Sequence, residues 1–431
     1  MVDSERLAAR LGPWQERLVA DQRLPCAQVA VVRHGKVCYQ AQAGEQAPGT
    51  PLRADTIFRI YSMTKPIVSM ALMMLYEEGR FQLNDPVKLW LGKQWSRESM
   101  RVFVRGNADL YETVPCKTSI RVWHLLTHTS GLTYGFDAHG VVNPVDALYH
   151  HAGVGRTKPG LDLAEFVDKL ATMPLMFQPG EHWHYGYNTD VVGRLVECIS
   201  GLPLDEFLRT RVFEPLAMHD TGFHVPPAKR DRFAALFMPA DLDPTLGPRK
   251  PASLTRASGL VDISAPSDFN YRSVEELGDK KMLSGGGGLV STLADYTCFC
   301  QMLLRCGRGE PALISRKTLE FMTRNFLPDG QDMEQLAPPG GYSELPEEGI
   351  GFGLGFSVVL DPAKSKQICS PGTFAWGGAA STIFWIDPQE DLAVIFMTHL
   401  MFNDRLRLPL RAMLQSLVYG AVVSKPLTAR L

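Results

Sequence analysis

Hydrophobic residues follow two different spacings along this chain, and the spacings divide it into strand-rich ends and a helical middle. Near the start, apolar residues recur at helical spacing, which predicts an amphipathic helix capped by Asp3 or Ser4. The apolar face of this helix holds Leu7, Leu11, Trp14 and Leu18. Two alternating runs rich in β-formers then flank His34 and Gly35, an arrangement typical of a β-hairpin.

A second amphipathic helix is predicted after residue 62, with Gly79 as its natural C-terminal stop. Its apolar positions are Ile67, Met70, Ala71, Met74 and Leu75. Between residues 85 and 285, helical patterns alternate with loops rich in proline and glycine, and clear strand patterns are scarce. We therefore expect this middle part of the chain to be mostly helical.

The last part of the chain returns to strand patterns. A helical run over residues 293–307 precedes a predicted strand, "GFGLGFSVVLD", and residues 381–399 hold two apolar runs around the turn "DPQED". The chain then forms a final predicted helix. Its apolar positions include Leu410, Leu414 and Leu417.

Hairpins at both ends of the chain imply an antiparallel sheet. The simplest assembly is an α/β fold of the α+β kind, in which one sheet is built from both termini, covered by the terminal helices, and interrupted by a helical insertion. We expect a single domain over residues 1–431. Its sheet-containing part is formed by residues 1–85 and 285–431, and its mostly helical part by residues 86–284.

Composition narrows the function classes. The 431 residues are 45% hydrophobic and 21% charged, as in an ordinary globular protein with a sizeable core. A formal net charge of −2 gives no electrostatic case for nucleic acid or an anionic membrane as a partner. No apolar run approaches the ~18 residues that span a bilayer, and the charged residues 1–23 lack the apolar core of a signal peptide. We therefore expect a cytoplasmic protein that does not contact membranes.

The eight cysteines match neither a disulfide framework nor a zinc site. They are Cys26, Cys38, Cys116, Cys198, Cys298, Cys300, Cys306 and Cys369. No C-x-x-C pair occurs among them. We expect buried, reduced thiols and neither a metal nor an organic cofactor.

Ser62 and Lys65 are the strongest candidates for catalysis. Residues three apart share a helix face, and a serine in the first turn lies near the positive end of the helix dipole, which favours developing negative charge. If Lys65 is buried, desolvation lowers its pKa and lets its amine accept a proton, so that the pair activates a hydroxyl without histidine. The alternative is a capping serine beside a solvated lysine, and the spacing alone does not decide between the two.

Other catalytic patterns are absent or incomplete. No G-x-S-x-G nucleophile elbow occurs, because "GFSVV" lacks the second glycine. His124 and His128 are four apart but outside an H-E-x-x-H motif, so we expect them to be structural. His182 and His184 are candidates to line a pocket. The glycines at 285–288 are not followed by Gly-Lys-Ser/Thr, so a tight turn explains them better than a phosphate-binding loop.

The residues around Ser62 resemble a known family. "FRIYSMTKPIVSMALMMLYEEGRFQLNDPV", which begins at Phe58, is similar to the opening motif of the serine β-lactamase and penicillin-binding-protein superfamily, and most similar to its class C branch. Residues 123–132 and 284–304 resemble two further landmarks of that branch. The resemblance extends over about residues 25–402. It implies the β-lactamase/transpeptidase-like fold.

The family also needs a tyrosine supplied by the helical part. In "WHYGYNTDVVGRLVE", the register with the family's helix places Tyr185 as the catalytic tyrosine, which shares a proton with Lys65 and relays it to the leaving group. Class C β-lactamases carry Tyr-x-Asn, whereas here the third position is Tyr187 and Asn188 stands one place later. Tyr187 is therefore a rival, and the resemblance makes both Tyr187 and Asn188 candidate substrate-binding residues.

The third family motif, K-T-G, is replaced here by Trp376, Gly377 and Gly378. We expect the two glycines to let the backbone approach a ligand closely, and Trp376 to offer an apolar wall and one N–H donor in place of the lysine. The W-G-G form resembles the family VIII carboxylesterases, which have this fold and cleave simple esters. By the same resemblance, the backbone N–H groups of Ser62 and Ala379 form the oxyanion hole.

The resemblance implies a serine hydrolase that cleaves short-chain carboxylic esters through an acyl-enzyme on Ser62. Alternatives on the same site are a class C-like β-lactamase, a D-amino-acid amidase or peptidase, and an acyltransferase that delivers the acyl group to an alcohol. A catalytically dead binding scaffold is a further alternative. The partner is then a small-molecule ester or amide. Pocket width depends on the loops near residues 225–258 and 325–350, and the oligomeric state is not predicted.

Overall fold

The computed structural model describes residues 3–134, 143–154, 161–240, 259–264, 282–338, 348–403 and 408–423. Its largest sheet has eight antiparallel strands in the order β10-β11-β12-β13-β14-β1-β2-β3. In chain order the strands are β1 (Cys26–Arg33), β2 (Lys36–Ala47), β3 (Thr50–Pro51), β10 (Ile350–Phe352), β11 (Ser357–Val359), β12 (Phe374–Gly377), β13 (Ile383–Asp387) and β14 (Leu392–Met397). The pairing of β1 with β14 joins the two ends of the chain, which confirms the predicted assembly.

Both predicted hairpins form. His34 and Gly35 connect β1 to β2 with φ values of +52° and +74°, the left-handed backbone that a tight two-residue hairpin turn requires. Strands β13 and β14 pair on either side of the predicted turn. The run "GFGLGFSVVLD", predicted as one strand, instead forms β10 and β11, because the chain reverses at Gly355, where φ is +96°.

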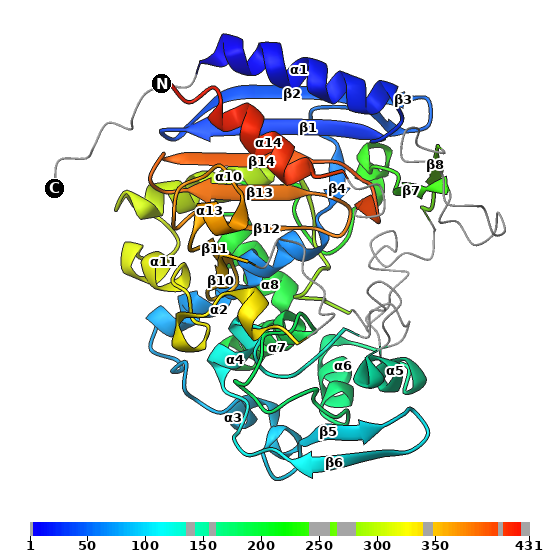
Figure 1. Ribbon diagram of the computed structural model, residues 1–431, viewed down its shortest axis with the longest axis vertical. Coiled ribbons are helices and arrows are strands. Elements are labelled where there is room, and N and C mark those ends of the chain that lie inside the picture. The colour runs from blue at the N-terminus through cyan, green and yellow to red at the C-terminus, as the bar shows by residue number, and fades with distance from the viewer. Residues whose placement is uncertain are drawn as a thin grey trace.

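Helices cover both faces of this sheet (Figure 1). On one face lie α1 (Ser4–Ala20) and α14 (Leu410–Tyr419), which contact each other, and on the other lies α10 (Leu293–Gly307). Every residue of β1 is buried because alternate side chains enter the two opposite cores. Asp3 caps α1 by accepting a hydrogen bond from the Arg6 amide over 2.9 Å, so the first of the two predicted caps is the one used.

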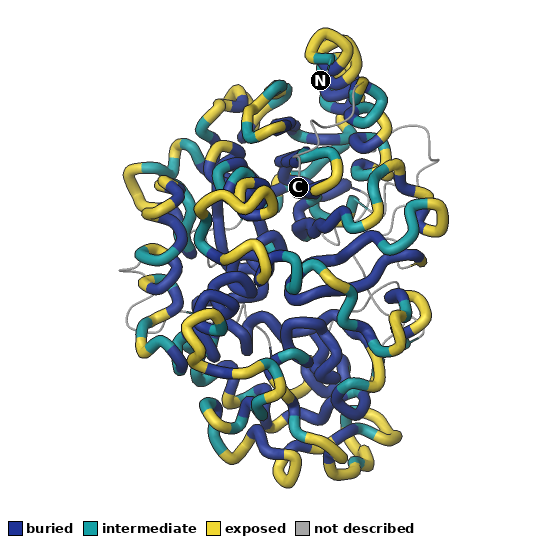
Figure 2. Tube along the Cα trace, turned by 90° about the vertical axis from the view of Figure 1, so that its left-hand side faces the viewer, coloured by how far each residue is buried: buried dark blue, intermediate teal, exposed yellow. Residues whose placement is uncertain are grey.

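The helical part packs around α2 (Thr64–Glu77) and α7 (Asn188–Ser200), which contact each other. Against α7 pack α3 (Lys88–Leu91), α4 (Val122–Leu126), α6 (Leu163–Leu170) and α8 (Leu204–Leu208), and α5 (Pro144–His151) contacts β5. Three further helices belong to the sheet-containing part: α11 (Arg316–Met322) packs against α10, α12 (Met333–Leu336) contacts β10, and α13 (Pro362–Ser365) follows β11. The prediction of an amphipathic α2 is wrong, since all of its residues from 64 to 75 are buried. The helix lies within the molecule and so needs no polar face. Figure 2 shows that buried chain, in dark blue, fills the middle of the molecule.

Three short strand pairs did not emerge from the hydrophobic pattern. They are β4 (Ile57–Arg59) with β9 (Val290–Thr292), β5 (Arg101–Gly106) with β6 (Tyr111–Pro115), and β7 (Phe237–Pro239) with β8 (Leu260–Asp262). The first pair matters for function because it carries the chain directly to Ser62. Parts of the loops expected to set pocket width, residues 241–258 and 339–347, lie outside the described residues.

All eight cysteines lie in the described ranges and none is in a disulfide. The prediction of buried thiols is correct for Cys26, Cys116, Cys300 and Cys306 and wrong for the other four, which are only partly buried. Within those ranges no cluster of three or more histidine, cysteine, aspartate or glutamate side chains could hold a metal ion. No helix of the described chain is both long and apolar enough to cross a membrane.

Candidate active site

Ser62 lies in a short 3-10 turn, Tyr61–Met63, between β4 and the start of α2. It therefore lies just before the α-helix. The spacing had suggested instead that Ser62 lies in the first turn of the helix. Tyr61 has a φ of +41°, a strained conformation for a non-glycine residue that is found most often at functional sites. Only 6% of Ser62 is exposed, so the hydroxyl faces a nearly closed environment.

Lys65 is 1% exposed and lies one turn from the serine, which excludes the alternative of a solvated lysine. Its Nζ is 3.1 Å from Ser62 Oγ and donates to the carbonyl oxygen of Gly286 over 2.7 Å. The same atom lies 4.4 Å from the ring centre of Tyr185 and 5.3 Å from that of Tyr134. The structure thus brings the predicted nucleophile and base together. The groups that surround Lys65, which are the Gly286 carbonyl and the rings of Tyr134 and Tyr185, are far away in the sequence.

Tyr185 is the tyrosine that lies against Lys65. It is 3% exposed, and its phenol oxygen accepts a hydrogen bond from Trp376 Nε1 over 3.1 Å. Tyr187 packs instead against the rings of Tyr134 and Phe166, at centroid distances of 4.6 and 5.0 Å. Lys65 lies over the ring of Tyr185, so the geometry favours that residue over its rival.

Gly186 explains why the two tyrosines are separated by glycine. A Cβ at this position would lie 2.3 Å from the carbonyl oxygen of Leu132, so only glycine lets the backbone pass. The segment is also bound by His128, whose Nδ1 accepts from the amide of Gly186 over 3.4 Å and from Asn188 Nδ2 over 3.0 Å. Burial, followed by the charge of Lys65, holds the pKa of His128 well below its usual value.

Asn188, predicted to contact substrate, is fully buried at the start of α7. Its Oδ1 accepts a hydrogen bond from Ser130 Oγ, while its Nδ2 binds His128. The amide is therefore engaged on both sides by protein groups. This geometry gives Asn188 a role in holding the tyrosine segment.

The other histidines also have protein partners. His124 Nδ1 accepts from the Arg121 amide over 3.0 Å, and burial lowers the pKa of His124 to about 3. His184 binds Thr133 Oγ1 over 3.0 Å, and burial lowers the pKa of His184 to about 4. His182 is exposed and its Nδ1 binds the carbonyl of Leu336 over 3.2 Å.

The W-G-G segment lies at the end of β12 and contacts the residues before Ser62. A Cβ on Gly378 would lie 2.5 Å from the carbonyl oxygen of Ile60. The glycine therefore allows the backbone at Ile60, and not a ligand as expected, to approach closely. Trp376 is fully buried among aromatic rings, including Phe352 at 5.2 Å. The indole therefore contributes to the candidate site by donating a hydrogen bond to Tyr185.

Ala379 follows these glycines and is half-buried. In the described part of the chain, its amide donates to no backbone or side-chain acceptor. Gly378 donates to the Thr382 carbonyl over 2.8 Å and accepts from the Ser381 amide over 2.8 Å, which fixes the turn that presents Ala379. An amide held by a rigid turn and left without an acceptor is suited to bind an oxyanion.

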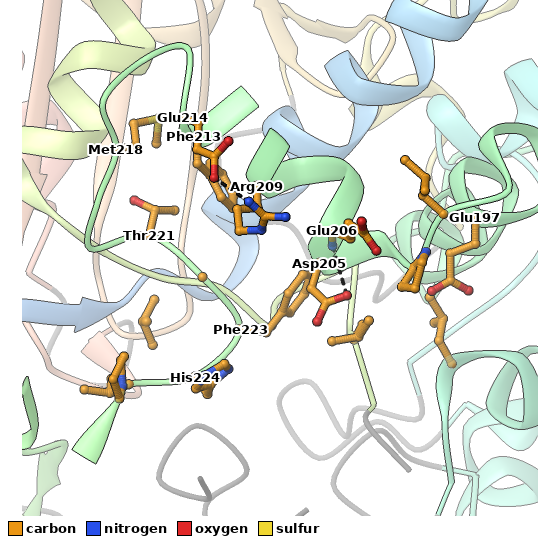
Figure 3. Close-up of a pocket in the computed structure, with 18 of the residues that line it drawn as sticks. Glu197, Asp205, Glu206, Arg209, Phe213, Glu214, Met218, Thr221, Phe223 and His224 are labelled. Carbon is orange, nitrogen blue, oxygen red and sulfur yellow. Dashed lines mark hydrogen bonds and ion pairs between the residues drawn. The ribbon is translucent and has the colours of Figure 1, made fainter. Parts of the chain in front are cut away.

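A large cavity among the described residues lies away from these side chains. It has a volume of about 1280 Å³ and is formed by the end of α7, by α8 and by the segment that follows. Figure 3 shows the charged side chains of Glu197, Asp205, Glu206 and Arg209 around it. None of Ser62, Lys65, Tyr185 and Trp376 lines this cavity, so the candidate active site is identified by its chemistry and not by its volume.

Three residues of the site went unnoticed in the sequence. The Gly286 carbonyl belongs to the glycine run that we interpreted only as a tight turn, and Tyr134 belongs to no motif. Asp190, in the helix that follows the tyrosine motif, was not singled out as a site residue, yet its Oδ1 accepts a hydrogen bond from Ser284 Oγ over 2.6 Å. An acidic residue five positions after the predicted catalytic tyrosine was the available signal for Asp190.

Known proteins are similar to this chain over most of its length. The profile of the Beta-lactamase family matches residues 14–416. Esterase EstB from Burkholderia gladioli is 30% identical over 428 residues, covering 97% of each chain. Protein Rv1367c from Mycobacterium tuberculosis is 34% identical over 355 residues, or 81% of this chain and 79% of the relative.

A solved structure shares the whole architecture. EstCE1, described as a hydrolase with promiscuous acyltransferase activity, superposes with a TM-score of 0.74 at 25% identity, covering 97% of this chain and 99% of that one. The match extends over both the sheet and the helical part, so the fold is β-lactamase/transpeptidase-like, as the resemblance implied. The chain belongs to the Beta-lactamase family.

Proposed function

We propose that this protein is a serine hydrolase that cleaves short-chain carboxylic esters through an acyl-enzyme on Ser62. One observation carries the proposal: the amine of a fully buried lysine lies 3.1 Å from the serine hydroxyl oxygen. A buried amine is easier to deprotonate than a solvated one, so Lys65 in its neutral form can accept the serine proton.

In the first half of the reaction, Ser62 Oγ attacks the ester carbonyl while its proton passes to Lys65 Nζ. The N–H groups of Ser62 and Ala379 bind the oxyanion of the tetrahedral intermediate. Collapse of this intermediate breaks the bond to the alcohol, which leaves with a proton delivered through Tyr185. In the second half, water attacks the acyl-enzyme and its proton returns through the same pair, which restores the free serine.

Trp376 supports Tyr185 in this scheme. A hydrogen bond from an indole N–H to a phenol oxygen favours the phenolate and fixes the ring above Lys65. The lysine of K-T-G, by contrast, would offer a positive charge to a substrate carboxylate. The replacement of that lysine by a buried indole supports neutral esters over β-lactams as substrates.

The relatives support hydrolysis and keep a second candidate open. EstB is named as an esterase, and EstCE1 as a hydrolase that also transfers acyl groups. Transfer to an alcohol would use the same acyl-enzyme, with an alcohol in place of water. The β-lactamase and amidase alternatives share the nucleophile as well. We also propose the single-domain division inferred from the sequence, a cytoplasmic location, and a small-molecule ester as the partner.

The test compares wild type with Ser62→Ala on p-nitrophenyl butyrate and on nitrocefin. We expect ester cleavage that is lost with the serine, and little nitrocefin turnover. Efficient nitrocefin turnover would favour the β-lactamase alternative. Full ester cleavage by Ser62→Ala would refute the mechanism.

A further inference from the structure

Asp190 is a fully buried carboxylate in the first turn of α7. Its Oδ1 accepts two hydrogen bonds, from Ser284 Oγ over 2.6 Å and from the Gly286 amide over 3.2 Å. Both donors belong to the turn of residues 284–288, which is closed by a bond from the Gly288 amide to the Ser284 carbonyl over 2.8 Å. One carboxylate oxygen therefore binds the turn at two points.

The turn also rests directly on α7. A Cβ on Gly285 would lie 2.5 Å from the carbonyl oxygen of Thr189, and a Cβ on Gly286 would lie 2.4 Å from Asp190 Oδ2. Contacts this close leave no room for side chains, which accounts for the glycines at these two positions. The position of the turn is thus set by α7 and by Asp190 in particular.

The same turn supplies the hydrogen-bond acceptor of Lys65. Its Nζ donates to Gly286 O over 2.7 Å and lies 3.1 Å from Ser62 Oγ. When one N–H of a neutral amine points at a fixed carbonyl, the orientation of its lone pair is restricted. A shift of the Gly286 carbonyl would therefore turn the lone pair away from the serine proton.

We propose that Asp190 is a positioning residue for the general base: its carboxylate holds the 284–288 turn so that Gly286 O orients Lys65 toward Ser62. The inference rests on the proposed function and deepens it. Asp190 acts through Gly286 and does not act on the substrate itself.

Asp295 offers a matched control. It is also a buried carboxylate that holds a loop, since its Oδ2 accepts from the Asp220 amide and from Thr221 Oγ1, each over 2.8 Å. Within the described part of the chain, the Asp295 carboxylate makes no hydrogen bond to Lys65 or Gly286. Truncating either aspartate removes one buried loop anchor, so only a specific effect on catalysis separates the two.

The experiment measures kcat and KM on p-nitrophenyl butyrate for wild type, Asp190→Ala, Asp190→Asn, Asp295→Ala and Ser62→Ala. We expect Asp190→Ala to lower kcat by about 100-fold with KM changed less than about threefold. Asp190→Asn keeps an acceptor oxygen and should restore kcat to within about tenfold of wild type, while Asp295→Ala stays within about threefold.

The proposal is overturned if Asp190→Ala loses no more kcat than Asp295→Ala. If Asp190→Ala does not fold, as judged by near-UV circular dichroism, Asp190→Asn decides, because a 100-fold loss with the acceptor in place would refute positioning through Oδ1. Activity in Ser62→Ala would instead refute the proposed function itself, so the two failures are distinguishable.

Discussion

The indole N–H of Trp376 donates to the phenol oxygen of Tyr185 over 3.1 Å, and both side chains are almost completely shielded from solvent. The residue that stands in place of the K-T-G lysine is thus directed at the tyrosine that we propose to be catalytic. In the proposed mechanism this hydrogen bond links the W-G-G motif to proton transfer, and the site lacks the positive charge that a lysine would bring.

Replacement of Trp376 by phenylalanine keeps a buried ring beside Phe352 but removes the donor. Losing one hydrogen bond of about 1 kcal/mol to the proposed proton-relay group should lower kcat on p-nitrophenyl butyrate by roughly fivefold, with little change in KM. Trp385→Phe is the control, because Trp385 is equally buried on β13 and faces the opposite core. Equal kcat values for the two variants would show that the hydrogen bond has no catalytic effect.

Restoring the family lysine with Trp376→Lys should not create a β-lactamase. The position is fully buried among aromatic rings, so an ammonium group there would be desolvated without a carboxylate partner. We expect a lower Tm and no rise in nitrocefin turnover. An unchanged Tm together with a clear gain in nitrocefin turnover would contradict the assignment of Trp376 as a buried support.

Gly378→Ala tests the contact between the W-G-G segment and the nucleophile segment. The added methyl would meet the Ile60 carbonyl and Thr382 Oγ1 at less than van der Waals distance, so both Tm and kcat should fall. Gly307→Ala at the end of α10 meets nothing within 4 Å and serves as the control, with stability unchanged or slightly raised. Wild-type kcat in Gly378→Ala would show that the two segments are not coupled.

Four buried histidines make stability depend on pH. Burial lowers the pKa of His124 and His399 to about 3 and that of His184 to about 4, and it holds the pKa of His128 well below its usual value. The unfolded chain, with histidine pKa values near 6.5, binds more protons between these limits, so the free energy of unfolding falls as pH drops from about 6.5 toward 4.

Urea unfolding between pH 7.5 and 4.5 measures this dependence. His399→Gln should reduce the slope by up to about one proton, because His399 is held neutral by burial and by the nearby charge of Arg59. Gly307→Ala, which changes no titratable group, should leave the slope unchanged. Identical slopes for wild type and His399→Gln would show that this histidine is not neutral in the folded protein.

Local patterns were sufficient for much of the fold. The turn at His34 and Gly35, the cap at Asp3 and the apolar face of α1 depend on neighbouring residues, and each formed as predicted. The hairpin of β5 and β6 was missed because its flanking runs are short and carry charged residues; its strands expose Val104, Tyr111 and Val114.

The contacts of the site were harder to predict when their two residues lie far apart in the sequence. Ser62 and Lys65 are three apart, so the spacing made them a candidate pair, and the family resemblance favoured that pairing over a solvated lysine. The bond from Lys65 to Gly286 spans 221 residues and ends on a backbone carbonyl, which leaves no side-chain signature in the sequence. The bond from Trp376 to Tyr185 spans 191 residues, so the sequence showed both partners without showing that they meet.

Covalent labelling with a fluorophosphonate tests the central claim most directly. Intact mass should show one adduct, and peptide mapping should place it on Ser62. The labelling rate should fall by about 100-fold or more in Lys65→Ala and Tyr185→Phe, while Trp385→Phe keeps the wild-type rate. An adduct on another residue, or full labelling of Ser62→Ala, would contradict the assignment of Ser62 as the nucleophile.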